Sequence, residues 1–123
     1  MAEERTYTGG CHCGAVRYRV RMALESALVC NCSICSRTGT MLSFVPAGRF
    51  ELTSGEDVLT DYQFGKRWIH HLFCSRCGVR SFARGALANG DPIAAINVRC
   101  LDGVDLDAVP LKRFDGRSLP IEA

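Results

Sequence analysis

The sequence lacks any long uninterrupted apolar run. A helix that spans a bilayer needs about 20 consecutive apolar residues, and no stretch of this 123-residue chain approaches that length. The first ten residues are polar and include Glu3, Glu4 and Arg5, which is not the pattern of a secretory leader. We therefore expect neither membrane insertion nor export, and we expect a cytoplasmic location.

Lysine is scarce, because the basic side chains are 13 arginines and only two lysines. The formal net charge of +2 is small, and it would become slightly negative if seven cysteines were held as thiolates by two zinc ions. The chain therefore has no general basic footprint for nucleic acid, and its aromatic residues are not interleaved with a basic track. We exclude nucleic acid as a partner. An anionic small ligand stays open, since a guanidinium holds a carboxylate or phosphate through two parallel hydrogen bonds.

A 3.6-residue apolar repeat is also missing, and period-2 patterns take its place. Residues 16–22 alternate strictly, with apolar side chains on one face and Arg17, Arg19 and Arg21 on the other, where we expect exposure to solvent. Turn residues, many of them glycine, separate the candidate strands, and one short helical turn fits within 104–111. The sequence predicts a single domain over residues 1–123 with an all-β (mainly β) fold and short helical turns at most. Further strands are expected at 27–29, 41–45, 50–53, 58–64, 68–73, 79–82 and 93–100.

Eight cysteines in so short a chain require a chemical explanation. Disulfides do not persist in a reducing compartment, so metal binding or redox chemistry is the leading interpretation. A disulfide framework and a thioredoxin-like redox pair are the alternatives, although the redox pair needs a βαβ context that the chain does not show. Seven of the cysteines form three groups: Cys11 and Cys13; Cys30, Cys32 and Cys35; Cys74 and Cys77.

Spacings of one or two residues let a turn direct two sulfurs at one ion, and thiolates are ligands that zinc prefers. Four sulfurs close a structural site, whereas three leave a coordination position for a substrate atom. The simplest division gives an open site to Cys30, Cys32 and Cys35 and a closed site to the other four. A zinc ribbon that pairs Cys32 and Cys35 with the last two cysteines is the other division that the spacing allows.

Three runs of the chain carry a resemblance to a known family: GCHCGAVRY at 10–18, CNCSICSRTGT at 30–40 and FCSRCG at 73–78. In order and spacing they are similar to the three cysteine motifs of the glutathione-dependent formaldehyde-activating enzyme family, which includes centromere protein V. The resemblance implies a β-tent fold with two zinc ions. It also implies that Cys11, Cys13, Cys74 and Cys77 bind a structural zinc and that Cys30, Cys32 and Cys35 bind a catalytic zinc.

The activity that the resemblance implies is a carbon–sulfur lyase reaction, of the S-(hydroxymethyl)glutathione synthase type. Glutathione, or a similar small thiol, adds to formaldehyde or a related aldehyde. Three positions depart from the family pattern: Asn31 stands where His is frequent, Ser36 where a basic residue or Gln is frequent, and Val79 where Ser or Thr is frequent. Because residues around the ligands tune a metal strongly, these departures bear on the choice of thiol and aldehyde.

Other polar residues near the motifs have narrower predicted roles. Arg37 follows the third cysteine of the middle motif closely enough to meet a glutathione carboxylate, with a solvated arginine as its alternative. His12 is expected to be a turn residue. His70 and His71 are expected on opposite faces of one strand, so that at most one faces a cavity. Cys100 is expected to be a buried free thiol on the face of its strand that carries Ile96 and Val98.

The strand aromatics Phe44, Tyr62, Phe64 and Trp68 are expected in the core or in a pocket wall. The alternative function is a non-catalytic, zinc-stabilised binding module of the same fold. Cys35 discriminates between the two functions, because a binding module needs closed metal sites and an incomplete three-sulfur site would serve no purpose in it.

Overall fold

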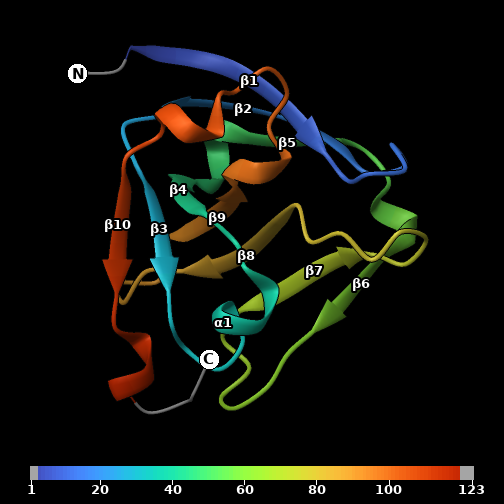
Figure 1. Ribbon diagram of the computed structural model, residues 1–123. Coiled ribbons are helices and arrows are strands. Elements are labelled where there is room, and N and C mark those ends of the chain that lie inside the picture. The colour runs from blue at the N-terminus through green and yellow to red at the C-terminus, as the bar shows by residue number, and fades with distance from the viewer. Residues whose placement is uncertain (1–2, 120–123) are drawn as a thin grey trace.

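The computed structural model describes residues 3–119, and these form ten strands in two sheets (Figure 1). The prediction of a mainly β fold is confirmed. The smaller sheet contains, in spatial order, β1 (Glu4–Gly10), β2 (Arg17–Ala23) and β5 (Phe50–Ser54). The larger sheet contains, in spatial order, β10 (Leu111–Phe114), β3 (Ala27–Cys30), β4 (Leu42–Pro46), β9 (Pro92–Asn97), β8 (Phe82–Ala86), β7 (His70–Cys74) and β6 (Leu59–Tyr62).

The helical content of the described residues is limited to short turns, as predicted. One α-helical turn, α1 (Cys35–Thr38), lies beside the middle cysteine motif. The segment 104–111 contains the expected helical turn. Between residues 3 and 119 we find no helix long and apolar enough to cross a membrane. The 3-10 turns are Ala47–Arg49, Glu56–Val58, Val98–Cys100, Leu106–Ala108 and Gly116–Ser118.

The alternation of β2 determines where the core lies. Tyr18 and Val20 are fully buried on one face of this strand, and the Tyr18 ring packs against the rings of Phe50 and Phe82 at centroid distances of 5.1 and 5.8 Å. The Tyr18 hydroxyl donates a hydrogen bond to the Ser81 carbonyl oxygen at 3.1 Å, so its polar end is satisfied. Since Phe50 belongs to the small sheet and Phe82 to the large one, this aromatic cluster joins the two sheets.

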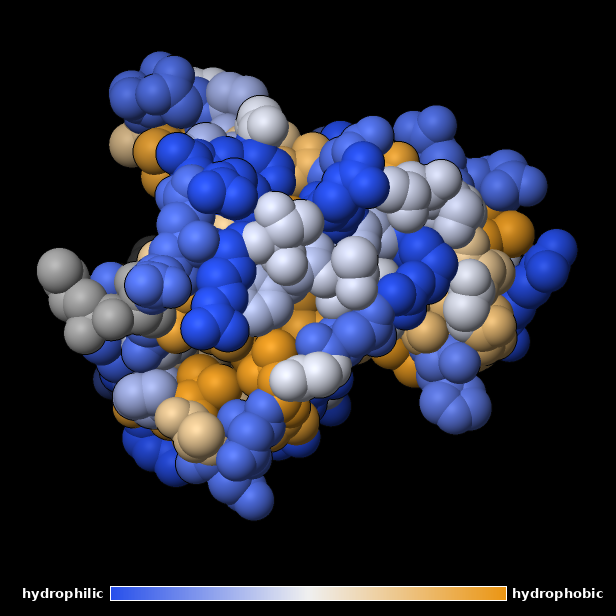
Figure 2. All heavy atoms as spheres, turned by 90° about the horizontal axis from the view of Figure 1, so that it is seen from above, coloured by the Kyte–Doolittle hydropathy of each residue, from blue (hydrophilic) through white to orange (hydrophobic). Residues whose placement is uncertain are grey.

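The opposite face of β2 is polar and faces solvent, as the arginine spacing predicts. Arg17 pairs with Asp102 and Arg19 pairs with Glu51. Arg21 pairs with Glu4 at 2.7 Å. Figure 2 views the molecule from the side of β1 and β2 and shows a mostly hydrophilic face with small apolar patches. Such exposed ion pairs contribute about 0–1 kcal/mol each, so they serve solubility more than stability.

Two strand predictions need correction, and two strands were not predicted. Residues 79–81 are not in a strand, because β8 begins only at Phe82. The strand expected at 93–100 ends at Asn97, where the chain turns into a 3-10 segment. The sequence pattern also failed to predict β1 and β10, two edge strands with mostly exposed side chains. An edge strand that buries few side chains carries a weak hydrophobic pattern.

The missed strand β10 matters for the site. It pairs in parallel with β3, and the last pair of the register is Phe114 with Cys30. The C-terminal segment is therefore placed directly beside the middle cysteine motif.

Candidate metal centres and the adjoining cavity

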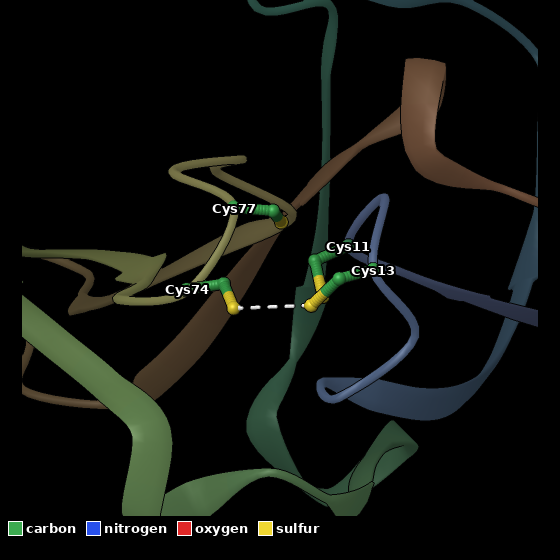
Figure 3. A group of neighbouring side chains, drawn as sticks. All are labelled: Cys11, Cys13, Cys74 and Cys77. Atoms are coloured by element: carbon green, nitrogen blue, oxygen red, sulfur yellow. Dashed lines mark hydrogen bonds between the residues drawn. The ribbon is translucent and has the colours of Figure 1, made fainter.

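Four cysteines meet between the two sheets (Figure 3). Cys11 and Cys13 lie in the turn between β1 and β2, Cys74 ends β7, and Cys77 lies in the turn that follows. Their sulfur atoms all lie within 4.8 Å of one another. The Cys11–Cys13 and Cys13–Cys74 sulfur distances are 3.6 and 3.7 Å. Four thiolates at about 2.3 Å from a tetrahedral zinc ion lie about 3.8 Å apart, so this cluster fits such an ion.

The turns that carry these cysteines direct main-chain N–H groups at the sulfurs. Val16 N–H donates to Cys11 Sγ at 3.3 Å, and Arg76 N–H donates to Cys74 Sγ at 3.4 Å. Main-chain N–H groups of Cys13 and Val79, together with the neighbouring sulfurs, lower the pKa of Cys77 to about 6. N–H donors stabilise a thiolate, which is the form that binds a metal ion.

The middle motif forms a second and smaller cluster. Cys30 ends β3, Cys32 lies in the turn, and Cys35 begins α1; their three sulfur atoms lie within 4.8 Å of one another. Cys32 N–H donates to Cys30 Sγ at 3.4 Å, and Cys35 N–H donates to Cys32 Sγ at 3.5 Å. Within residues 3–119 no fourth His, Cys, Asp or Glu joins this group. The cluster therefore fits a metal ion with three protein ligands.

Burial has the opposite effect on one thiol of the middle cluster. Burial and, after it, the adjacent Cys32 sulfur raise the pKa of Cys35 to about 12. The thiol form of Cys35 is thus favoured in the metal-free protein, and a metal ion must displace that proton on binding.

The C-terminal segment holds the middle motif through Asn31. The Asn31 side-chain amide donates to Asp115 Oδ1 at 2.9 Å, and its Oδ1 accepts from Arg117 N–H at 2.8 Å. Asn31 N–H also donates to the Phe114 carbonyl oxygen at 3.2 Å. Asn31, which departs from the family pattern, therefore ties β10 and the following turn to the cysteine motif.

A cavity of about 290 Å³ adjoins the middle cluster, and Cys30, Cys32 and Cys35 form part of its wall. Most of the wall is apolar, so the cavity disfavours bulk water around the sulfurs. The same wall contains His71 and Arg80. Its apolar residues include Leu28, Leu42, Phe64, Ile69, Phe82 and Phe114.

The two histidines of β7 face opposite sides, as predicted. His70 is exposed, and its Nδ1 lies 2.6 Å from Asp61 Oδ2. His71 is buried and lines the cavity. Burial and the charge of Arg80 lower the pKa of His71 to about 4, so its imidazole is neutral near pH 7. Sequence reasoning missed Arg80, because it lies in a segment that was expected to be a strand and carries no motif.

Other predicted residues lie outside the cavity wall. Arg37 is exposed, and its Nη1 donates to the Ser33 carbonyl oxygen at 2.7 Å, so its role in binding a carboxylate remains a prediction. His12 and Ser36 are exposed in their turns. Val79 contributes a main-chain N–H to Cys77, while its side chain packs against the core.

Two expectations about side-chain position are wrong. Cys100 does not share a strand face with Ile96, because it lies in the 3-10 turn beyond β9; its thiol is half-buried, 3.9 Å from the Arg80 carbonyl oxygen. The aromatics also separate. Phe44 and Phe64 line the cavity and Tyr62 lines a shallower neighbouring pocket, as expected of a pocket wall. Trp68 is 64% exposed and lines neither, so the expectation is wrong for this residue.

These features define a class of protein: a small, mainly β protein with two cysteine clusters that can hold metal ions, one of which opens into an apolar cavity. The chain belongs to the glutathione-dependent formaldehyde-activating enzyme family, whose model matches residues 6–112. It is also similar to a Rhodobacter sphaeroides protein of known crystal structure. The two are 32% identical with a TM-score of 0.74, and the match covers 85% of this chain and 99% of that one.

Proposed function

We propose that this protein is a zinc-dependent carbon–sulfur lyase that condenses glutathione, or a similar small thiol, with formaldehyde or a related aldehyde. The observation that carries the proposal is the cluster of Cys30, Cys32 and Cys35, which has three sulfurs, no fourth ligand among residues 3–119, and an apolar cavity beside it. Family membership supports the same activity. A thiolate-rich zinc site also suits the reducing cytoplasm that the sequence predicts.

The reaction is an addition without any redox change. The thiol sulfur forms a bond to the carbonyl carbon, the carbonyl π electrons move to oxygen, and the thiol proton ends on that oxygen to give an S-hydroxymethyl adduct. When bound to the middle cluster, zinc supplies an electrophilic centre that favours the thiolate form of a thiol.

The residues of the chain contribute position and environment. Cys30, Cys32 and Cys35 would hold the ion at one end of the cavity, and the apolar wall would limit competition by water. Asn31 would keep the motif rigid through its bonds to the C-terminal segment. Cys11, Cys13, Cys74 and Cys77 would hold the structural zinc, at a distance from the reaction. Arg37 remains the sequence-based prediction for one glutathione carboxylate.

The test is the rate of adduct formation from formaldehyde and glutathione, measured by exchange NMR with zinc-loaded protein. We expect a rate above that of the same mixture with free zinc. The matched control is Cys35→Ser, which should remain folded and lose the acceleration. Native mass spectrometry should detect two zinc ions per chain and a glutathione complex that the variant does not form.

The same measurements can also reject the proposed activity. If the zinc-loaded protein leaves the rate at its uncatalysed value for glutathione and for other small thiols, the proposed activity is wrong. Collapse of the fold in Cys35→Ser would then favour the non-catalytic binding module, in which every metal site serves folding.

A further inference from the structure

Two buried polar atoms of the cavity wall have no hydrogen-bond partner among residues 3–119. They are His71 Nε2 and Arg80 Nη1. An unpaired buried donor costs about 1–3 kcal/mol, and more when it is charged, so such atoms are rare and require an explanation, of which a bound ligand is one. Both lie in the wall of the same cavity as the middle cysteine cluster.

His71 is held rigidly for a binding role. Its side chain is only 9% exposed, and its ring stacks on Phe64 at a centroid distance of 5.4 Å and an interplanar angle of 18°. Because burial keeps the imidazole neutral near pH 7, it adds no positive charge to the cavity. In its Nε2–H tautomer it offers one hydrogen-bond donor.

Arg80 differs from the arginines of β2, each of which pairs with a carboxylate on the surface. No carboxylate within residues 3–119 pairs with Arg80. Its guanidinium lies 5.9 Å from the Phe73 ring centroid, and its main chain is fixed because its carbonyl oxygen accepts from Asn97 Nδ2 at 2.8 Å. A partly buried guanidinium without an acidic partner can bind a carboxylate through two parallel hydrogen bonds.

We propose that Arg80 and His71 form a carboxylate-binding subsite of the cavity, so that the substrate pair of the middle cluster includes a carboxylate. This inference rests on the proposed function and narrows its substrate class. The carboxylate belongs either to the thiol or to the carbonyl compound. Since the rest of the wall is mostly apolar, we expect the part of the ligand that joins the carboxylate to the reacting atom to be uncharged.

The alternative role for Arg80 is to balance the charge of the metal site. Three thiolates and one zinc ion leave a net negative charge, and Arg80 is close enough to Cys35 for that charge to favour the guanidinium. In that role Arg80 would stabilise the metal site, and its loss would reduce zinc content rather than discrimination between ligands. The two roles therefore differ in a measurable way.

The experiment measures binding to the zinc-loaded protein by calorimetry, with three probes. The first, 3-mercaptopropionate, carries a thiol and a carboxylate. The second, 2-mercaptoethanol, carries the thiol without the carboxylate, and the third, propionate, carries the carboxylate without the thiol. We expect 3-mercaptopropionate to bind about tenfold or more tightly than 2-mercaptoethanol. Propionate should bind weakly and shift the His71 imidazole signals in NMR spectra.

Arg80→Gln should remove the advantage of 3-mercaptopropionate and the effect of propionate, and leave zinc content and 2-mercaptoethanol binding unchanged. His71→Phe keeps the stacked ring and should remove part of the advantage. Arg84→Gln is the matched control, because Arg84 is an exposed arginine over the Phe50 and Phe82 rings and does not line the cavity.

A second arm compares glyoxylate with formaldehyde as the acceptor of 2-mercaptoethanol. A preference for glyoxylate that Arg80→Gln removes assigns the carboxylate to the carbonyl compound.

Any of the following results would overturn the subsite: no preference for a carboxylate in either arm, a preference that survives Arg80→Gln, or a preference lost in Arg37→Gln instead. Loss of zinc in Arg80→Gln would assign Arg80 to the metal site and also reject the subsite. The failure of the proposed function looks different. Propionate would then still bind through Arg80, while no thiol addition would be catalysed.

Discussion

Gly116 packs its main chain against the middle cysteine cluster. A Cβ at this position would lie 2.6 Å from Cys30 Sγ and 3.1 Å from Cys32 Cβ, both of which belong to the candidate metal site. The backbone of Gly116 does not lie in the left-handed region, so the effect of alanine would be steric. We predict that Gly116→Ala lowers zinc affinity at the middle cluster about tenfold or more, which is the cost typical of changes to residues that surround metal ligands.

The measurement for Gly116→Ala is competition with a chelator, which should leave one zinc ion per chain where the parent protein retains two. Gly48→Ala is the control, since a Cβ there meets nothing within 4 Å. Equal zinc retention in both variants would show that the C-terminal segment does not determine the geometry of the cluster.

His71 predicts a specific pH dependence of stability. Burial, followed by the charge of Arg80, lowers its pKa from 6.5 to about 4, while Asp61 opposes the shift. The unfolded chain therefore binds this proton first, and stability is fully present above pH 6.5 and declines as the pH falls toward 4. Between about pH 7.5 and pH 5 the parent protein should lose about 2 kcal/mol more unfolding free energy than His71→Phe.

Denaturant titrations of both zinc-loaded proteins at the two pH values test this prediction. Lowered carboxyl pKa values at Glu4, Asp102 and Asp115 also reduce stability on acidification, but they act equally in both proteins. The difference in unfolding free energy between the two proteins therefore measures the contribution of the His71 imidazole. Parallel losses would show that His71 is not desolvated.

At the scale of elements, Asn31 connects β10 to the middle motif. Its side chain joins Asp115 and Arg117 N–H, and these bonds supplement the short parallel pairing of β10 with β3. We predict that Asn31→Ala leaves the two sheets intact but speeds hydrogen exchange about tenfold at main-chain amides of 111–118, because each lost hydrogen bond costs about 1 kcal/mol.

Mass spectrometry of exchanged peptides measures this effect. Asn89→Ala is the control, because Asn89 makes its bonds to Asp91 within an exposed turn far along the chain from this segment. Unchanged exchange in Asn31→Ala would mean that β10 is held by its strand pairing alone.

The elements that the sequence predicted well are those that bury one face. The strict alternation over 16–22 located β2, since every second side chain lies in the core. The edge strands β1 and β10 have mostly exposed side chains, so period 2 produced no contrast of polarity. In the segment 79–82 only Phe82 belongs to a strand, and Val79 packs against the core from the irregular chain that precedes β8, so its apolar character did not indicate a strand.

Of the candidate site, the cysteines could be predicted from the sequence, whereas Arg80 and Gly116 could not. Short cysteine spacings indicated which sulfurs share a turn, and the structure groups them as the simplest division expected. Sequence spacing could not show that Arg80 and Gly116 lie beside Cys30 and Cys35, because those contacts arise from the order of strands in the large sheet. A half-buried arginine without a carboxylate partner is visible only after folding.

At the scale of the whole molecule, the four-cysteine cluster connects the two sheets. Cys11 and Cys13 come from the turn of the small sheet, and Cys74 and Cys77 come from the large one (Figure 3). A metal ion there would link segments that are more than 60 residues apart in the sequence, since Cys13 and Cys74 are 61 residues apart. The middle cluster, by contrast, draws its three ligands from six consecutive residues, 30–35, and bridges nothing distant.

This difference predicts unequal effects on stability. Cys13 is exposed, so Cys13→Ser removes a ligand with little loss of packing. It should lower the unfolding free energy of the zinc-loaded protein by several kcal/mol, on the order of a third of the binding energy of a structural zinc ion. Cys35→Ser should lower it by about 1 kcal/mol, because the local cluster constrains only one turn. Denaturant unfolding followed by circular dichroism makes the comparison. Addition of a chelator should then destabilise the Cys35→Ser variant strongly and the Cys13→Ser variant only slightly. If Cys35→Ser proves the more damaging change, the middle cluster is the structural site, and the assignment of the reaction to it fails.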